Sequence, residues 1–474
     1  MSNSTAKMSR IQLTAMVVGG MVGAGIFSLP RTFANATGPV GAAIAWVIAG
    51  IGMYTLARVF QHLAQRKPDL DAGVFMYAKE AFGDYPGFLS AFGYWIGSCI
   101  GNVSYWVLIK STLGAFFPVF GDGNTVVAIL VASVGIWLFH FLILRGVKQA
   151  AFINTVVTFA KVIPIIVFVV IMILAYKADM FTLNIQSAAQ EGSIVQQVRA
   201  TMLVTVFVFI GIEGASVYSR YAKKREDVGF ATITGFCVVI GLMVLVSMLP
   251  FAVLARTDVA GMRQPSMAAV LEQVVGPWGG LFVSIGLLIS VLGAYLAWSL
   301  ICAEVMFAAA KNKDMPALFA KENANEVPAN ALWITNIIVQ LLVASTYFSR
   351  DAFTLMLNLT SSMALIPYLF VAAYGVILAR RGKSYEVRPE ERKRDLAFAA
   401  VAVIYTVFMI IAGGLSYVLL SAVLYAPGTA LYVWARRERG LPVFQGPVET
   451  GIFAVTVIAA VAGVVGLATG FITA

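Results

Sequence analysis

The chain has 474 residues, of which 60% are hydrophobic and only 12% are charged, and its net charge is +10. A soluble domain carries about 25% charged residues because its surface faces water, so this composition excludes an ordinary soluble protein and indicates a surface that faces lipid. The two histidines and the three cysteines, which show no CxxC spacing, give no basis for a metal site, a disulfide framework or a cofactor.

Long apolar segments follow one another from the N-terminus onward. A helix needs about 20 apolar residues to cross the ~30 Å hydrocarbon core. After a cytoplasmic tail of residues 1–10, the first apolar run is too long for a signal-peptide core of ~7–15 residues. The boundaries within 396–435 are not fixed by the sequence, and we divide this stretch at Gly413-Gly414, which offers a tight turn. The thirteen predicted spans are residues 11–36, 39–63, 84–117, 125–144, 150–176, 195–219, 228–255, 277–310, 329–348, 353–379, 396–412, 415–435 and 449–472.

The distribution of basic residues agrees with these spans. Cytoplasmic loops of membrane proteins carry an excess of Lys and Arg. With a cytoplasmic N-terminus, the loops on that side hold 24 of the 33 basic residues. We therefore expect a multi-pass protein of the plasma (inner) membrane of a prokaryote, with an external C-terminus. The basic run 380–394 faces anionic lipid in this topology, and no nucleic-acid partner is expected. The basic residues on the opposite side are Arg31, Lys177, Arg199, Arg256, Arg263 and Arg350.

Two predicted spans are interrupted by glycines at matching positions. The middle of the first span reads Gly19-Gly20-Met21-Val22-Gly23-Ala24-Gly25-Ile26-Phe27, and the middle of the sixth reads Ile210-Gly211-Ile212-Glu213-Gly214-Ala215-Ser216. Gly-interrupted spans in corresponding places of two halves indicate inverted repeats with broken helices. The repeats would be residues 11–176 (spans 1–5) and 195–379 (spans 6–10), followed by additional spans 11–13 in 396–472. Close packing of helices at small residues is the alternative explanation.

Four short segments carry a resemblance to a known family. They are Gly23-Ala24-Gly25-Ile26-Phe27, Trp95-Ile96-Gly97 through Gly101-Asn102, Phe209-Ile210-Gly211-Ile212-Glu213 and Pro316-Ala317-Leu318-Phe319. With them the chain resembles the amino acid–polyamine–organocation transporter superfamily over roughly residues 10–436, and within it the basic amino acid/polyamine antiporters. The arginine–ornithine antiporter branch is the most similar, and it also tends to carry a thirteenth span. The resemblance implies an all-α polytopic membrane protein with the five-plus-five inverted-repeat (LeuT-like) transporter fold, broken helices 1 and 6, and additional C-terminal helices, about 13 spans in all.

The two breaks are the first candidates for a binding site. A broken helix exposes unpaired N–H groups at one end and carbonyls at the other, which lipid tolerates only where they line a cavity. An end with unpaired N–H groups attracts an anion, and an end with unpaired carbonyls attracts a cation. The first break would suit a carboxylate, and the second an amino group. The resemblance implies the same for the α-carboxylate and α-ammonium groups of a substrate, at Gly23, Ala24, Gly25 and Ile26 and at Ile210 and Gly211.

Several charged residues lie inside predicted spans, where a charge costs ~2.5–3.5 kcal/mol on insertion scales. We expect Glu213 to act in substrate binding or gating, or else to cap backbone donors at the break. Lys161 lies in the middle of the fifth span. The resemblance implies that it contacts the broken first helix, which argues against sodium coupling. The alternative is that the Lys161 side chain snorkels to the membrane surface. Whether Glu304 lines the pathway is left open. Lys110 and Arg58 lie nearer helix ends and are expected to snorkel.

The third span carries a small-residue stripe. Gly93, Gly97 and Gly101 recur every four residues, as in closely packed membrane helices, and Ser98 and Asn102 lie beside them. The resemblance implies that Gly97, Ser98 and Asn102 receive the distal part of the substrate side chain. Further residues that it implies are Thr360 and Ser361 for substrate binding, Phe207 and Trp298 for stacking on the substrate, and Tyr94 and Tyr368 for gating or coupling.

We therefore predict a secondary active transporter that exchanges a cationic amino acid for a related cationic product by alternating access, with arginine for ornithine as the first hypothesis. Phe207 stands where the arginine–agmatine antiporters have tryptophan, which argues against that pair. The alternatives are a lysine–cadaverine or ornithine–putrescine exchanger, a proton-coupled amino acid symporter and, from another class, a channel or membrane receptor. No nucleophile–base or metal constellation points to an enzyme. The expected partners are small cationic amino acids or polyamines and membrane lipid; the exact substrates, the stoichiometry and a homodimer stay open.

Overall fold

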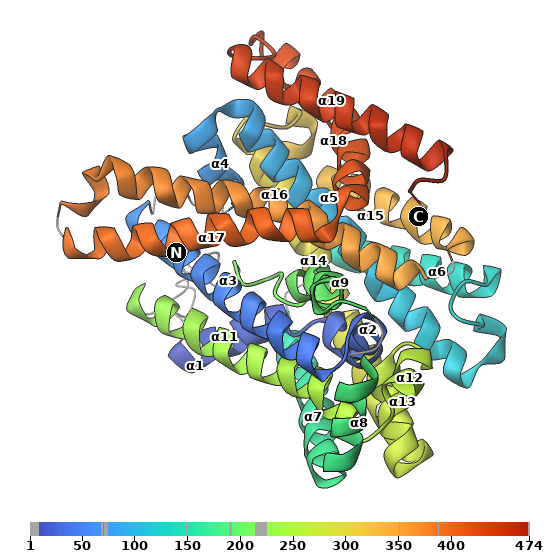
Figure 1. The fold of residues 1–474 in the computed structure, drawn as a ribbon. Coiled ribbons are helices and arrows are strands. Elements are labelled where there is room, and N and C mark those ends of the chain that lie inside the picture. The colour runs from blue at the N-terminus through green and yellow to red at the C-terminus, as the bar shows by residue number, and fades with distance from the viewer. Residues whose placement is uncertain are drawn as a thin grey trace.

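The computed structural model describes residues 9–67, 70, 74–146, 150–188, 192–213, 225–349, 351–386 and 388–472. All regular elements in these ranges are helices (Figure 1). The α-helices are α1 (Arg10–Met21), α2 (Leu29–Ala36), α3 (Pro39–Arg66), α4 (Val74–Phe82), α5 (Asp84–Phe116), α6 (Val126–Leu144), α7 (Ala150–Leu174), α8 (Ala178–Ala188), α9 (Ile194–Phe207), α11 (Arg225–Met248), α12 (Arg256–Gly261), α13 (Ser266–Val275), α14 (Pro277–Lys311), α15 (Ala329–Ser345), α16 (Ala352–Arg381), α17 (Glu390–Gly413), α18 (Leu415–Glu438) and α19 (Pro447–Ala468). The short 3₁₀ helices are η1 (Ala24–Ser28), η2 (Pro118–Phe120), η4 (Leu249–Ala252), η5 (Ala317–Ala320), η6 (Thr346–Phe348) and η7 (Lys383–Tyr385).

Nine helices in the described ranges are long and apolar enough to cross a membrane, and eleven spans result if each of two bent pairs is counted as one. The bent pairs are Leu13–Met21 with Ala24–Ala36, at 45°, and Ala160–Leu174 with Ala178–Ala188, at 97°. The two other predicted spans coincide with the 33-residue α5 and the 14-residue α9. The predicted division of 396–435 is confirmed, because α17 ends at Gly413 and α18 begins at Leu415. The total of thirteen spans stays a prediction.

Four short helices were not expected from the sequence. The helices α4, α8, α12 and α13 have 9, 11, 6 and 10 residues. Each is well below the ~20 residues that a crossing helix needs, so a search for apolar runs passes over them. The helix α8 follows the fifth predicted span after a sharp bend, which is visible at the lower edge of Figure 1.

Helices α5, α14 and α16 lie beside the two interrupted segments, since η1 contacts α5 and α14 and α9 contacts α16. Helix α5 packs against both α14 and α16, and α9 packs against α16. The glycines of α5 permit the close approach, because a Cβ on Gly97 would lie 2.9 Å from the Cβ of Met363 on α16. Likewise, Gly93 faces the hydroxyl of Tyr425 on α18, and Gly101 faces Thr360 on α16. The predicted small-residue stripe is therefore a helix-packing surface.

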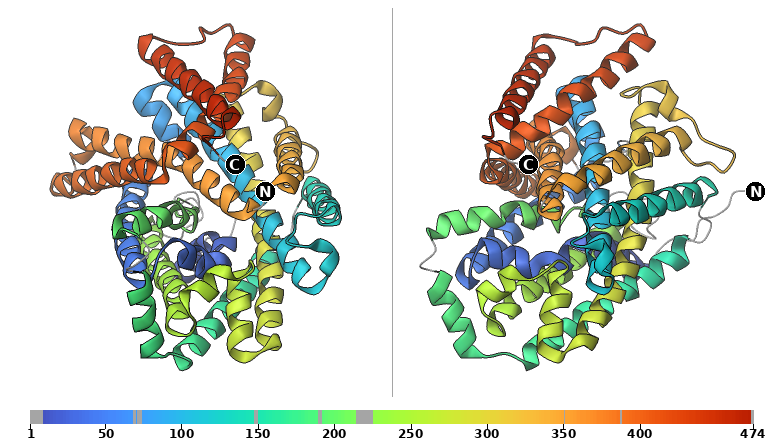
Figure 2. Two further views of the ribbon diagram at one scale, coloured as in Figure 1. Left: turned by 45° about the vertical axis from the view of Figure 1, so that its right-hand side comes forward. Right: turned by 90° about the vertical axis from the view of Figure 1, so that its right-hand side faces the viewer.

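The last three helices differ in how closely they pack on the rest of the molecule. Helix α17 packs against α16 and α3, α18 against α16 and α5, and α19 mainly against α18. Only 17% of the most apolar window of α19 is buried, so most of its surface is available to lipid. Figures 1 and 2 show α18 and α19 as a pair at the edge of the structure. The division of the chain into two repeats and additional spans stays a prediction.

Candidate functional site

The two interrupted segments touch each other at their glycines. Helix α1 ends at Met21, and the chain resumes as η1 at Ala24 with a bend of 45°. Helix α9 ends at Phe207 and is followed by turns up to Glu213. A Cβ on Gly211 would lie 2.9 Å from the carbonyl oxygen of Gly20. Both predicted breaks are present, and they lie against each other. The predicted break residues Gly214, Ala215 and Ser216 lie outside the described residues.

The contact between the breaks requires glycine at position 211. Gly211 has φ +108°, a backbone conformation that costs other residues ~1–3 kcal/mol, and an added methyl group would also press on the backbone of Gly20. We expect Gly211→Ala to lower the thermal unfolding midpoint of the purified protein by several degrees and to abolish transport in proteoliposomes. Gly241→Ala is the matched control, because no atom lies within 4 Å of the added Cβ. A Gly211→Ala protein as stable and active as this control would show that the contact is dispensable.

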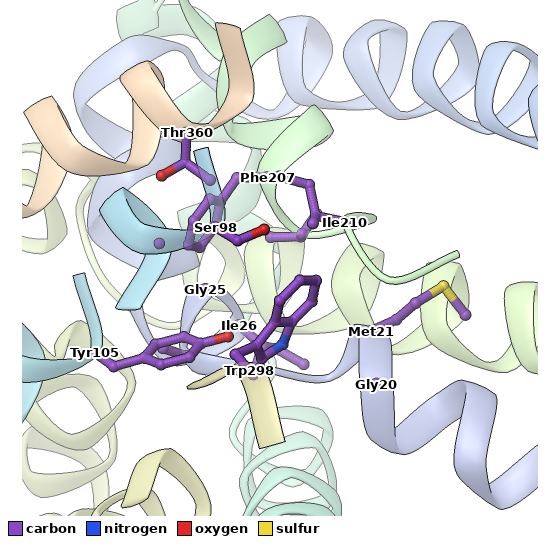
Figure 3. Close-up of a pocket in the computed structure, with 14 residues that line it drawn as sticks. Gly20, Met21, Gly25, Ile26, Ser98, Tyr105, Phe207, Ile210, Trp298 and Thr360 are labelled. Carbon is purple, nitrogen blue, oxygen red and sulfur yellow. The ribbon is translucent and has the colours of Figure 1, made fainter. Parts of the chain in front are cut away.

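A cavity of about 30 Å³ lies between the breaks. Pockets for small organic ligands are usually ~300–1,000 Å³, so the cavity in this structure is smaller than a substrate requires. In Figure 3 the rings of Phe207, Trp298 and Tyr105 converge on the cavity from different elements, with Ser98 and Thr360 beside Phe207. The lining residues are Gly20, Met21, Gly23, Ala24, Gly25, Ile26, Ser98, Gly101, Tyr105, Phe207, Val208, Ile210, Trp298 and Thr360.

The structure brings most of the predicted substrate-binding residues to this cavity. Five of the predicted residues do not line it, and one of these is Glu213. Gly97 packs on Met363, the amide of Asn102 donates to Cys302 Sγ at 3.7 Å, and Ser361 Oγ donates to the carbonyl of Leu203 at 2.7 Å. Gly211 lies behind the lining, against Gly20. The predicted residues at the cavity are Gly23, Ala24, Gly25, Ile26, Ser98, Phe207, Ile210, Trp298 and Thr360.

Five lining residues were missed from the sequence. Gly20 and Met21 lie directly before the first break, and Val208 lies within the second. Gly101 and Tyr105 follow Ser98 by three and seven residues on α5, a spacing that places side chains on one helix face. That spacing was present in the sequence and could have identified Tyr105.

Glu213 lies buried behind the cavity, 2% exposed, and does not line it. Its carboxylate accepts hydrogen bonds from Tyr94 Oη at 2.5 Å and from Tyr368 Oη at 2.8 Å. It also accepts from the backbone N–H of Gly211, at 3.1 and 3.2 Å to its two oxygens. The ring of Tyr94 lies 6.5 Å from the ring of Trp298, which does line the cavity. The carboxylate thus joins the second break to α5 and α16.

Lys161 is also buried, at 3% exposed, and its ammonium donates to the carbonyl of Gly19 at 2.6 Å. Gly19 lies in the last turn of α1, where carbonyls lack partners within the helix and a cation is favourable. The structure therefore joins α7 to the end of the first half-helix through Lys161. Glu304 is exposed on α14 and lines neither this cavity nor a second one described below. Within the described part of the chain, no group of three or more His, Cys, Asp or Glu side chains is placed to hold a metal ion.

Comparison with known proteins finds relatives over nearly the whole chain. Residues 8–422 match the family model for amino acid permeases. The chain is 54% identical to the arginine/ornithine antiporter of Pseudomonas aeruginosa over 99% of both chains. It is 41% identical to the L-lysine transport protein of Corynebacterium glutamicum, over 97% of this chain and 94% of that protein. It is 39% identical to the arginine/agmatine antiporter of Chlamydia abortus, over 92% and 91% of the two chains.

Proposed function

This chain belongs to the amino acid permease family, and on that premise we propose that it exchanges arginine for ornithine across the membrane by alternating access. The observation that carries the proposal is the contact of two interrupted helices beside a cavity lined by backbone and aromatic rings. Interrupted helices at the interface of two repeats are the usual substrate site of secondary transporters. The likeness to an arginine/ornithine antiporter over the full length supports this substrate pair.

The proposed substrate lies with its carboxylate at the start of η1. The first N–H groups of a helix have no partner within it, and they attract an anion. Ala24, Gly25 and Ile26 provide such groups at the cavity. The carbonyls that follow α9, at Val208 and Ile210, would receive the α-ammonium group, because the end of a helix carries partial negative charge.

The cationic side chain of the substrate would then lie among aromatic and hydroxyl groups. None of the residues known to line the cavity is charged. The nearby carboxylate of Glu213 does not line it but accepts a hydrogen bond from Tyr94. A guanidinium or ammonium over an aromatic ring gains ~0.5–2 kcal/mol, and Phe207 and Trp298 offer two such rings. Ser98 and Thr360 add hydroxyl acceptors. We infer that this cavity selects cations by stacking and hydrogen bonding, with the charge of Glu213 acting through Tyr94.

Counterflow in proteoliposomes tests the exchange. We expect external arginine to release preloaded labelled ornithine rapidly, with little release into buffer that contains no substrate. The reason is that an exchanger without bound substrate would not change back between its outward-facing and inward-facing states. The panel should include lysine, agmatine, cadaverine and putrescine. Equal release with and without external substrate would contradict exchange and point to a uniporter, a channel or a symporter, and a pH gradient that drives uptake without exchange would identify the symporter.

We also propose an inner-membrane location with a cytoplasmic N-terminus and an external C-terminus, on the basis of thirteen spans and the bias in basic residues. Thr469 is exposed at the end of α19. In a variant without the three native cysteines, we expect Thr469→Cys to react with an impermeant maleimide on intact cells. A cysteine at Arg380, in a predicted cytoplasmic loop, is the control that should react only after lysis. Reaction of both cysteines only after lysis would mean that an even number of spans separates them, and the reversed pattern would place the N-terminus outside if thirteen spans are present.

A further inference from the structure

A second cavity lies at the helix ends that are predicted to face the outside. Its volume is about 270 Å³, nine times that of the cavity between the breaks. Its walls come from five places: α2 at Arg31, the last turns of α5, the loop before α6, the end of α12 with the loop that follows it, and the segment that leads into α16. None of its lining residues was assigned to the substrate site. We call it the vestibule cavity.

The vestibule cavity contains a buried lysine. Lys110 lines it and is only 1% exposed, so the prediction that this lysine snorkels to water is wrong. Its ammonium donates to Thr346 Oγ at 2.8 Å, and the Thr346 hydroxyl itself donates to the carbonyl of Val343 at 2.6 Å. An ammonium has three N–H donors, so this single neutral acceptor leaves capacity for further partners.

The carboxylates of the cavity are already placed beside other cations. Asp122 lies 3.6 Å from Arg263, and Asp351 lies 4.0 Å from Arg31. Among the described residues, no acidic side chain lies within 4.0 Å of the ammonium of Lys110. The lining therefore holds three cations and two anions, with Lys110 as the buried cation that lacks a charged partner. A buried charge without a counter-charge costs several kcal/mol, and a bound anion would remove that cost.

We propose that the vestibule cavity is a binding site for a small monovalent anionic group, held by Lys110 with Thr346 at its side. Chloride and the carboxylate of an amino acid share this chemistry. The loop between α12 and α13 links the site to the first break, because Gln264 lines the cavity and accepts from the backbone N–H of Ser266 at 2.9 Å. Ser266 Oγ in turn donates at 3.1 Å to the carbonyl of Ser28, at the end of η1. An occupant would thus stabilise the segment whose first residues line the central cavity. The inference does not rest on the proposed substrates.

The test uses the full-length purified protein in isethionate salts at constant ionic strength. Sodium chloride and sodium acetate are titrated separately, and the thermal unfolding midpoint is recorded. The stoichiometry of bound labelled arginine is measured in the same buffer. The variants are Lys110→Met, Lys110→Arg and the control Lys177→Met, which removes an exposed cation from the same predicted face, outside the cavity.

We expect an anion-dependent rise of the midpoint in the wild type, Lys110→Arg and Lys177→Met, and anion affinity weakened at least about tenfold in Lys110→Met. A response to chloride with one bound arginine per chain identifies an inorganic occupant. A second bound arginine that Lys110→Met loses identifies an amino-acid carboxylate. If Lys110→Met does not fold, Lys110→Gln, which retains a donor to Thr346, takes its place. The proposal is overturned if the wild type responds to neither anion and binds one arginine, or if Lys110→Met (or Lys110→Gln in its place) responds like the wild type. Failure of exchange in counterflow would leave these binding results unaffected.

Discussion

Replacing Glu213 by glutamine is expected to slow the exchange of cationic amino acids at least about tenfold, a rise of ~1.4 kcal/mol in the barrier. The carboxylate accepts from two tyrosine hydroxyls and from the N–H of Gly211. A glutamine oxygen accepts at most two of these bonds, and its NH₂ group would face groups that now donate. Because hydrogen bonds to a charged group contribute ~1.5–3 kcal/mol and neutral ones ~0.5–1.5 kcal/mol, the junction of the second break with Tyr94 and Tyr368 would weaken.

The maximal exchange rate and KM distinguish a role of Glu213 in conformational coupling from a role in substrate binding. Since the side chain does not line the cavity, we expect the maximal exchange rate to fall more than KM rises. We also expect neutral analogues of similar length to be rejected less strongly, because the negative charge is gone. Glu304→Gln is the matched control, an exposed glutamate of α14 that should transport normally. Near-normal exchange and selectivity in Glu213→Gln would show that this glutamate only caps backbone donors at the break.

Replacing Lys161 by methionine is expected to leave the protein folded and to cut the transport rate by about tenfold or more. Methionine keeps most of the side-chain volume but leaves the carbonyl of Gly19 without its donor. A buried acceptor without a partner costs ~1–3 kcal/mol, and this cost would fall on the end of α1, directly before the break. The coupling of α7 to the first half-helix would therefore be lost in the state that the structure describes.

Measurements with Lys161→Met need to separate coupling from stability. Thermal unfolding and binding of labelled arginine report whether the protein folds and keeps its site, and counterflow reports the rate. Lys177→Met, an exposed lysine three residues beyond α7, is the control and should behave like the wild type. Wild-type exchange by Lys161→Met would show that the contact with Gly19 has no part in transport.

The sequence predicted the helices of this protein well wherever lipid dictates the pattern. A crossing segment must be apolar over about 20 residues and must satisfy its own backbone, so each predicted span overlaps a helix. The glycines Gly23 and Gly211 and the pair Gly413-Gly414 marked real interruptions for the same reason, since glycine is unfavourable within a helix. The short helices α4, α8, α12 and α13 leave no such pattern, because each has at most 11 residues, well below the length of a crossing segment.

The partners of the buried polar groups were decided by the tertiary structure. Glu213 meets Tyr94 and Tyr368 from 119 and 155 positions away, and Lys110 meets Thr346 from 236 positions away. Such contacts depend on how each helix is rotated and how closely its neighbours approach, which residue spacing along one helix does not specify. Lys110 shows the consequence: its place near a helix end indicated water, whereas surrounding loops bury it. The sequence by itself determined which charged and polar residues lie inside predicted spans. The packing of helices that are distant in the sequence determined what each of these residues contacts.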